Sequence, residues 1–251
     1  MIASRTRSIG WIALAALGAA CASTPPRYDQ MAAEELLNLS LAEIEDEDWD
    51  EATRALEQFI FQYPTHPRYQ EARLLLGQIY FDRGEYITAA SEFSRLATDF
   101  PSSPLADDAR FKVCESYYEL SPRAVLDQEY TIGAIDHCQS LLAYYPDSEY
   151  ADRARTMIAE LQTKLAEKLF RAGEHYFNRD AFDPAIKYYE EVLDRYADTD
   201  IAPRALFRLY ETYVELGYEE EAQEARERLL SEFPTSEEAA RIRDVGLADD
   251  R

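Results

Sequence analysis

Apolar side chains recur every three or four residues along most of this chain, which is the spacing of one face of an α-helix. One such pattern is repeated: in five segments an alanine is followed eleven residues later by an aromatic residue. In four of the five the next residue is proline, and only Ala197 breaks the rule. Unrelated amphipathic helices would not keep this interval, so the pattern indicates a structural repeat. The five segments are residues 51–64, 88–101, 133–146, 184–197 and 221–234.

A second helical pattern precedes these segments. Ala72, Leu76 and Tyr80 fall on one helix face, and the same spacing returns at residues 109–117 and 205–213. Glycines stand where the first helix of the second and of the fifth unit would end, and glycine commonly ends helices. The repeating unit is therefore a helical hairpin of about 34–37 residues.

This hairpin resembles the tetratricopeptide repeat family. Gly77 and Ala89 match the two small positions at which the paired helices of that family touch, and Tyr80, Phe93 and Pro101 match its other signature positions. The resemblance implies an all-α fold, a right-handed superhelical solenoid of five tetratricopeptide-like helical hairpins. A single hairpin cannot bury its apolar face, so its stability would come from stacking on its neighbours.

Two irregularities interrupt the repeat. The third hairpin has eight more residues between its two helices than the second, so residues 121–133 are expected to form a long, partly polar loop. Apolar residues then continue at steps of three and four with no Gly or Pro until Gly173, which predicts one long helix over about residues 148–179. This helix would join the first three hairpins to the last two.

The first twenty residues have the layout of a secretory signal peptide: two arginines, a twelve-residue uncharged run from Ile9 to Ala20, and small residues before Cys21. Leu17 and the small residues before Cys21 resemble a bacterial lipobox, which implies that this cysteine is acylated. The alternative is an ordinary secreted protein with an incidental cysteine. The expected organisation is a lipoprotein signal peptide (1–20), a flexible lipid-anchored tether (21–33), repeats 1–3 (34–147), the long helix with repeats 4 and 5 (148–236), and a capping helix and tail (237–251).

Composition narrows the possible functions. Apolar residues make up 47% of the chain, which is enough for a core. There are 49 acidic and 26 basic residues, and this net charge of −23 argues against nucleic acid as a partner. Acyl chains rather than charge would have to hold such a chain on a membrane. The three histidines have no metal-ligand spacing and no catalytic motif is visible, so neither a metal nor another cofactor is expected.

Two further cysteines lie in the third hairpin. In the expected register Cys114 faces Ala134, and Cys138 lies one turn further along. A lateral helix spacing of about 8–10 Å plus a turn of about 5 Å exceeds the roughly 7 Å Cα separation that a disulfide allows. We therefore expect Cys114 and Cys138 to be buried, reduced thiols.

The lipobox, the five repeats, the long helix, and an inserted loop with Asp127, Gln128 and Thr131 together resemble the BamD family, the lipoprotein subunits of the β-barrel assembly machinery. The resemblance covers residues 21–236. It implies a periplasmic scaffold without catalytic chemistry, which docks on the POTRA domains of a BamA-like barrel protein and helps recognise the C-terminal signals of unfolded outer-membrane proteins. Ala22, rather than Asp, after the cysteine favours the outer membrane by resemblance to Gram-negative lipoproteins.

A peptide-binding groove is expected on the concave face, which the first helices of the hairpins would line. Arg73 and Arg110 flank it and could receive a peptide carboxylate, or could pair with local acidic residues. The groove side chains could equally pack between helices. The candidate lining residues are Leu41, Ile44, Leu74, Gln78, Phe81 and Tyr118, with Phe177 at the end of the row.

The resemblance places BamA docking on the last two repeats. Relatives use a basic residue on the second helix of the fourth repeat, and Tyr188 stands there with Lys187 beside it. Arg204 and Arg208 on the next helix, together with Phe177, are further candidates, although both arginines could be ordinary solvated charges.

Two other functions are consistent with part of the pattern. One is a cell-envelope repeat scaffold of the cell-division or Tol–Pal type, whose usual coiled-coil N-terminus is absent here. The other is an accessory peptidoglycan-acting enzyme, which would need a catalytic pair that the sequence does not display.

Overall fold

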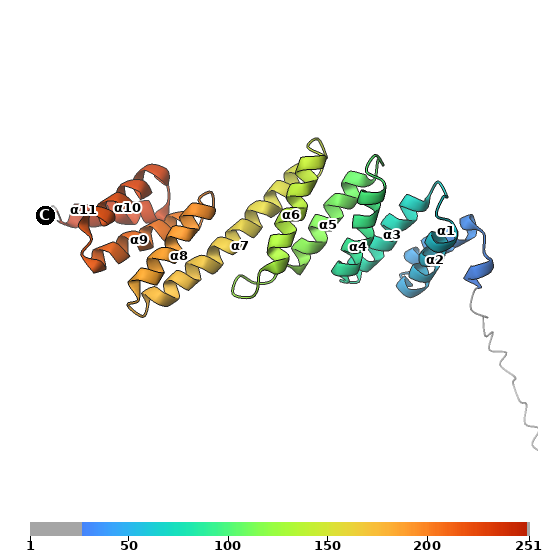
Figure 1. The fold of residues 1–251 in the computed structure, drawn as a ribbon, viewed down its shortest axis with the longest axis horizontal. Helices are drawn as coiled ribbons and strands as arrows, with labels where there is room; N and C mark the ends of the chain where they lie inside the picture. The colour runs from blue at the N-terminus through green and yellow to red at the C-terminus, as the bar shows by residue number, and fades with distance from the viewer. Residues whose placement is uncertain (1–26, 250–251) are drawn as a thin grey trace, which may run out of the picture.

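The computed structural model describes residues 27–249 of the chain, with side chains up to Arg243. The expected signal peptide and Cys21 lie outside the described residues. Within residues 27–249 all regular secondary structure is helical, and the helices follow one another as a row of antiparallel pairs (Figure 1). They are η1 (Tyr28–Gln30), α1 (Ala33–Glu45), α2 (Trp49–Gln62), α3 (Tyr69–Asp82), α4 (Tyr86–Asp99), α5 (Ala106–Leu120), α6 (Glu129–Tyr144), α7 (Ala151–Phe177), α8 (Phe182–Arg195), α9 (Ala202–Leu216), α10 (Glu219–Glu232) and α11 (Glu237–Asp249).

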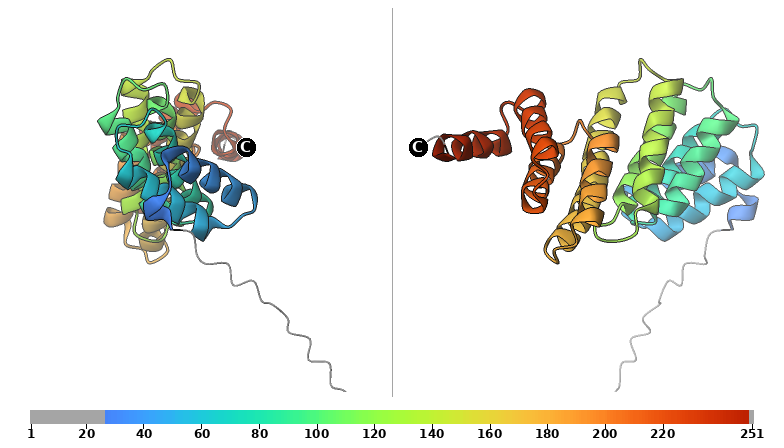
Figure 2. Two further views of the ribbon diagram at one scale, coloured as in Figure 1. Left: turned by 90° about the vertical axis from the view of Figure 1, so that its right-hand side faces the viewer. Right: turned by 60° about the vertical axis from the view of Figure 1, so that its left-hand side comes forward.

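Each helix packs mainly on its neighbours in sequence, which makes five hairpins from α1/α2 to α9/α10 (Figures 1 and 2). The first helices of the last hairpins also touch one another, from α5 to α7 to α9, and α11 closes the row against α9 and α10. The all-α hairpin solenoid expected from the repeat is confirmed. The long helix is α7, whose 27 residues are about 40 Å long at 1.5 Å per residue.

The repeated small residues are contact points between paired helices. Gly77 of α3 lies against the ring of Phe93 on α4, and a Cβ atom added at this glycine would meet that ring at 2.5 Å. Gly173 of α7 receives the ring of Tyr189 on α8 in the same way. Glycine is needed at both positions because any side chain would push the partner ring out of the contact.

The repeated aromatic residue marks the end of each second helix. Tyr63, Phe100, Tyr145, Tyr196 and Phe233 are the C-terminal capping residues of α2, α4, α6, α8 and α10. One of these rings also connects neighbouring hairpins, because the Tyr145 hydroxyl donates a hydrogen bond to the carbonyl of Pro101 at 3.0 Å. The Tyr63 hydroxyl donates to the carbonyl of Met31, just before α1 of its own hairpin, at 2.8 Å. The aromatic position therefore serves both the hairpin and the stack.

The described chain is ordered from its start against the first hairpin. Tyr28 and Met31 pack against the core of this hairpin, and residues 28–30 form a turn of 3₁₀-helix. The packed structure therefore begins before residue 34, inside the segment expected to be tether, and Arg27 is the first residue described. None of the described helices combines the length and the apolarity needed to cross a membrane.

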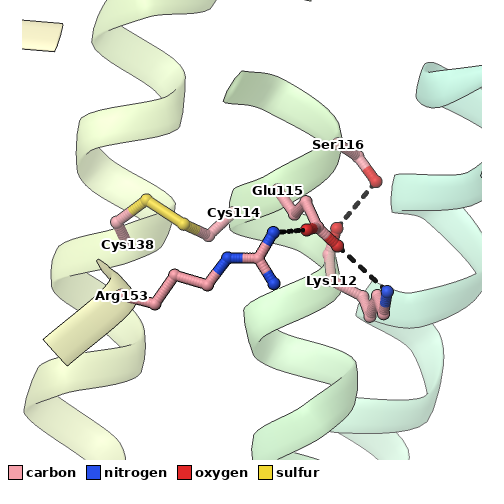
Figure 3. The surroundings of a disulfide bond; sticks show 6 residues. All are labelled: Lys112, Cys114, Glu115, Ser116, Cys138 and Arg153. Atoms are coloured by element: carbon pink, nitrogen blue, oxygen red, sulfur yellow. Dashed lines mark hydrogen bonds and ion pairs between the residues drawn. A yellow bond between two sulfur atoms is a disulfide. The ribbon is translucent and has the colours of Figure 1, made fainter. Parts of the chain in front are cut away.

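Cys114 and Cys138 form a disulfide bond, so the expectation of two reduced thiols is wrong (Figure 3). Their Cα atoms are 4.8 Å apart, and both residues are fully buried. The expected distance was measured between helix axes, but Cα atoms on facing sides lie nearer than the axes by up to about 2.3 Å on each helix. The offset of one turn was also wrong, because Cys138 rather than Ala134 lies opposite Cys114.

Candidate binding surfaces

Three of the expected groove residues lie along α3. Leu74, Gln78 and Phe81 are spaced by four and three residues, which puts them on one helix face. Leu74 and Phe81 are half-buried against the core of the second hairpin. The Gln78 amide donates to Asp82 at 2.7 Å, and Lys112 of α5 holds its ammonium nitrogen 5.3 Å from the Phe81 ring centroid. The α3 row therefore continues onto α5.

A charged strip extends the row from α5 to α7. Glu115 is 6% exposed and accepts from Lys112 at 3.0 Å and from Arg153 of α7 (Figure 3). Tyr118 donates its hydroxyl to Glu160 of α7, and this hydrogen bond, with burial, raises the pKa of Tyr118 to about 12. Tyr118 is thus an aromatic residue of the expected row, but its hydroxyl already forms a hydrogen bond within the protein. The sequence did not single out Lys112, Glu115 or Arg153.

Leu41 and Ile44 stand on α1, at the start of the row. Leu41 is half-buried, and Ile44 packs partly against the core of the first hairpin. Part of the Ile44 surface is therefore used between helices, which is the alternative that the sequence left open.

The two arginines expected beside the groove have internal partners. Arg73 is 7% exposed and forms an ion pair with Glu92 of α4, and its guanidinium also contacts Tyr69. Arg110 donates to the Ser140 hydroxyl at 2.9 Å and lies over the ring of Tyr144, 4.7 Å from its centroid. Both guanidinium groups join the two helices of a hairpin, but only Arg73 has the acidic partner considered for them, because Arg110 bonds a serine.

The structure brings Phe177, Arg204 and Arg208 together on the facing sides of α7 and α9. Arg208 lies 5.0 Å from the Phe177 ring centroid and pairs with Glu174 at 2.8 Å and with Glu211 at 2.7 Å. Burial lowers the pKa of Arg208, but the hydrogen bonds to Glu211 and Glu174 outweigh it, so the net shift is upward and the charge is firmly held.

Arg204 belongs to the same surface and lies over Phe170, 4.4 Å from its ring centroid. Arg241 of α11 covers Phe207 similarly, at 4.2 Å. These arginine and phenylalanine side chains surround an open cavity of about 190 Å³ between α7, α9 and α11. Phe170, Phe207 and Arg241 were not foreseen, because only the fold brings α11 beside α9.

Lys187 and Tyr188 lie on α8, away from this cavity. Tyr188 stacks on Tyr176 of α7, with ring centroids 5.6 Å apart and planes 12° from parallel. Lys187 is exposed. The candidate docking residues therefore divide into an α7/α9 group and an α8 group.

The inserted loop is tightly organised around Gln128. This side chain is 5% exposed, donates to the carbonyls of Arg123 and Leu126 at 3.0 Å each, and accepts from Thr131. Lys168 of α7 adds a hydrogen bond to the Leu126 carbonyl at 2.9 Å. The loop and the start of α6 also expose four large apolar side chains, which the sequence analysis missed: Val125, Leu126, Tyr130 and Ile132.

Among the described side chains, no three His, Cys, Asp or Glu residues gather in a way that could hold a metal ion. The surfaces described above consist of ion pairs, aromatic rings and hydrogen bonds on paired helices.

Comparison with known proteins adds the family context. A family model described as "YfiO: Outer membrane lipoprotein" matches residues 29–237. The outer membrane protein assembly factor BamD of Caulobacter vibrioides is 27% identical over 231 residues, covering 90% of this chain and 76% of that protein. BamD of Rickettsia prowazekii is 25% identical over 201 residues, covering 80% of each protein.

Solved structures of repeat proteins are also similar to this chain. The crystal structure of a TPR repeats protein from Bacteroides fragilis aligns with a TM-score of 0.48 and 12% identity, covering 86% of this chain and 98% of that one.

Proposed function

This chain belongs to the YfiO family of outer membrane lipoproteins, and from that membership we propose that it is a subunit of the β-barrel assembly machinery of the outer membrane. The match over residues 29–237 carries the proposal, because it spans almost the whole described array of hairpins. The curated relatives that support it are named outer membrane protein assembly factors. The protein acts as a non-catalytic scaffold that is held on the periplasmic face of the membrane by acyl chains on Cys21.

The row along α3 and α5 is the proposed site for unfolded outer-membrane proteins. Half-buried Leu74 and Phe81, with Lys112 between the helices, offer apolar and cationic contacts along an extended line. Such a line suits an extended peptide that ends in an aromatic residue. Leu41, Ile44, Gln78 and Tyr118 extend this site. Arg73 and Arg110 position its helices, since their guanidinium groups are already engaged inside hairpins.

The α7/α9 group is the proposed docking site for the POTRA domains of a BamA-like barrel protein. Arg208 and Arg204 present guanidinium groups held over Phe177 and Phe170, so their geometry is fixed before a partner arrives. Preorganised arginine and aromatic side chains are typical anchors of protein interfaces. Lys187 and Tyr188 on α8 form a second part of this interface.

Affinity purification of the native protein from its membrane tests the proposal. We expect recovery of a BamA-like barrel protein, and depletion of the chain should lower the content of outer-membrane barrels. Arg208→Glu should reduce this recovery, whereas Arg228→Glu should not, because Arg228 lies on α10, outside the α7/α9 group, and pairs with Glu232 of its own helix. An unchanged barrel content after depletion would contradict the assembly role.

A further inference from the structure

The first described residues are fixed at the C-terminal end of α2. The Gln62 amide donates to the backbone carbonyl of Asp29 at 3.1 Å, and the Tyr63 hydroxyl donates to that of Met31 at 2.8 Å. Tyr28 and Met31 also pack against the core of the first hairpin. The point at which the chain enters the fold is therefore held on α2.

This entry point is close to the proposed lipid anchor along the chain. Arg27 is only six positions after Cys21 in the sequence. A fully extended chain spans at most about 3.3–3.6 Å per residue, so covalent geometry limits this distance to about 20 Å. Acyl chains on Cys21 would therefore keep the end of α2 close to the bilayer surface.

Phe61 is the residue immediately before Gln62, and its side chain is 81% exposed. Among the described large apolar side chains it is the most exposed. Helix α2 buries Ala52, Leu56 and Phe59 in the hairpin core, so Phe61 lies on the outer side of the helix. No packing role within the hairpin accounts for an aromatic residue at this place.

We propose that the side chain of Phe61 inserts into the interfacial layer of the bilayer that holds the acyl chains of Cys21. This inference rests on the proposed acylation of Cys21. Interfacial apolar groups are buried about 5–10 Å into the boundary between headgroups and acyl chains, a depth that a phenylalanine on a tethered helix end can reach. The aromatic residue is then a second membrane contact. A single lipid anchor would leave the first hairpin free to rotate, whereas two contacts restrict its orientation on the bilayer.

The proposal can be tested with a marginal anchor, because two- or three-chain acylation would hide a second contact. Cys21 is the only cysteine outside the Cys114–Cys138 disulfide, so a single-alkyl maleimide can be attached to it selectively in chain 21–251. A single chain gives weak, reversible binding. With phosphatidylcholine vesicles, Phe61→Ala should lower the partition coefficient about tenfold, as expected for losing the burial of one large side chain.

Ile87→Ala is the matched control, since Ile87 is an exposed apolar residue of α4 in the next hairpin. This variant should bind like the parent. Equal partition of the Phe61→Ala variant and the parent would overturn the proposal. Phe61 is too exposed for its truncation to unfold the hairpin, and thermal unfolding of both variants checks this.

Insertion depth gives a second measurement. Trp49 is the only tryptophan of residues 21–251, so a Trp49→Phe background allows a single probe at Phe61→Trp or at Ile87→Trp. Lipids brominated near the headgroup should quench emission at position 61 and not at 87. Absence of quenching at 61 in vesicle-bound protein would overturn the proposal. An unmodified Cys21 in protein from the native membrane would instead refute the proposed anchoring, which separates the two failures.

Discussion

At Gly77 and Gly173 the absence of a Cβ atom determines how closely the two helices of a hairpin approach. Each glycine lies on the first helix of a hairpin and receives an aromatic ring from the second. The ring of Tyr189 is also fixed at its far end, because its hydroxyl donates to Glu174 at 2.7 Å. Such a ring can neither turn nor retreat easily when its neighbour grows.

Gly77→Ala should destabilise the protein by about 1–3 kcal/mol, the usual cost of overfilling a packed core. Alanine is the better helix former by about 1 kcal/mol, but the added Cβ would lie 2.5 Å from the Phe93 ring. Urea unfolding of the two proteins measures the difference. Adding Phe93→Leu should recover part of the loss, and an unchanged or increased stability of the single variant would contradict the contact.

His137 should make the stability of the protein depend on pH. Its ring is half-buried and lies against Tyr117, with ring centroids 4.4 Å apart. Burial lowers its pKa from the ordinary value of 6.5, Asp136 opposes this shift, and Arg110 adds to it. The unfolded chain then binds the proton more readily, so stability is complete above about pH 6.5 and falls as the pH drops below it.

Unfolding free energies at pH 7.5 and 5.5 check this expectation. The parent should lose more stability between these pH values than His137→Gln, which cannot be protonated in this range. Equal losses in the two proteins would show that the histidine does not contribute.

Sequence spacing is enough to predict contacts that depend on residue size, and it fails for those that depend on exact register. Gly77 and Ala89 were identified because they match the two small positions of the tetratricopeptide repeat. The pairing of Cys114 with Cys138 was not, since a difference of one helical turn decides whether two side chains meet across a hairpin. The partners of Arg73 could not be chosen either, because 49 acidic residues offer too many candidates.

The third hairpin is the element that departs most from the repeat, and several side chains cross-link it to itself and to α7. The disulfide joins α5 to α6, and Glu115 joins α5 to α7 through Arg153 (Figure 3). Lys164 of α7 reaches the hydroxyl of Ser121 at 2.7 Å, at the start of the inserted loop. The loop is therefore held by α7 as well as by its own ends.

Removing the disulfide with Cys114→Ala/Cys138→Ala should cost about 3.5 kcal/mol, the loop-entropy value for a bond between residues 24 apart in sequence. Denaturant unfolding with and without dithiothreitol measures it. The parent should lose comparable stability in the reductant, while the double variant should not respond to it. A parent that is unaffected by complete reduction would contradict a stabilising role for this bond.

The regular elements were predictable because local signals define their ends. The aromatic positions mark where five helices end, and α7 begins and ends within three residues of the expected limits. The inserted loop was predicted as a loop only. Its ordered form depends on burying Gln128, and no local rule predicts that a polar side chain will find three carbonyls and a hydroxyl within reach.

At the scale of the whole molecule the core is divided along the array. The first hairpin with α3, the second with α5, and the third with the start of α7 each have their own buried cluster. From α6 to α11 the buried residues form one larger cluster. The candidate surfaces follow this division, since the α3/α5 row lies on the segmented part and the arginine–phenylalanine cavity on the continuous part. Only the arginine–phenylalanine cavity depends on α11, which explains why sequence spacing along one helix could not reveal this cavity.

This division predicts how a core defect spreads. Leu161 of α7 is fully buried in the large cluster, and Leu56 of α2 is fully buried in the first. Truncating either leucine to alanine should cost about 2–5 kcal/mol, because each leaves a cavity in a packed interior. In a linear array each unit contacts only its neighbours, so the effect should stay in the affected part. Native-state hydrogen exchange should therefore show faster opening of α7–α10 in Leu161→Ala with α1–α2 unchanged, and the reverse in Leu56→Ala. A uniform loss of protection along the chain in both variants would instead mean that the five hairpins open as one cooperative unit.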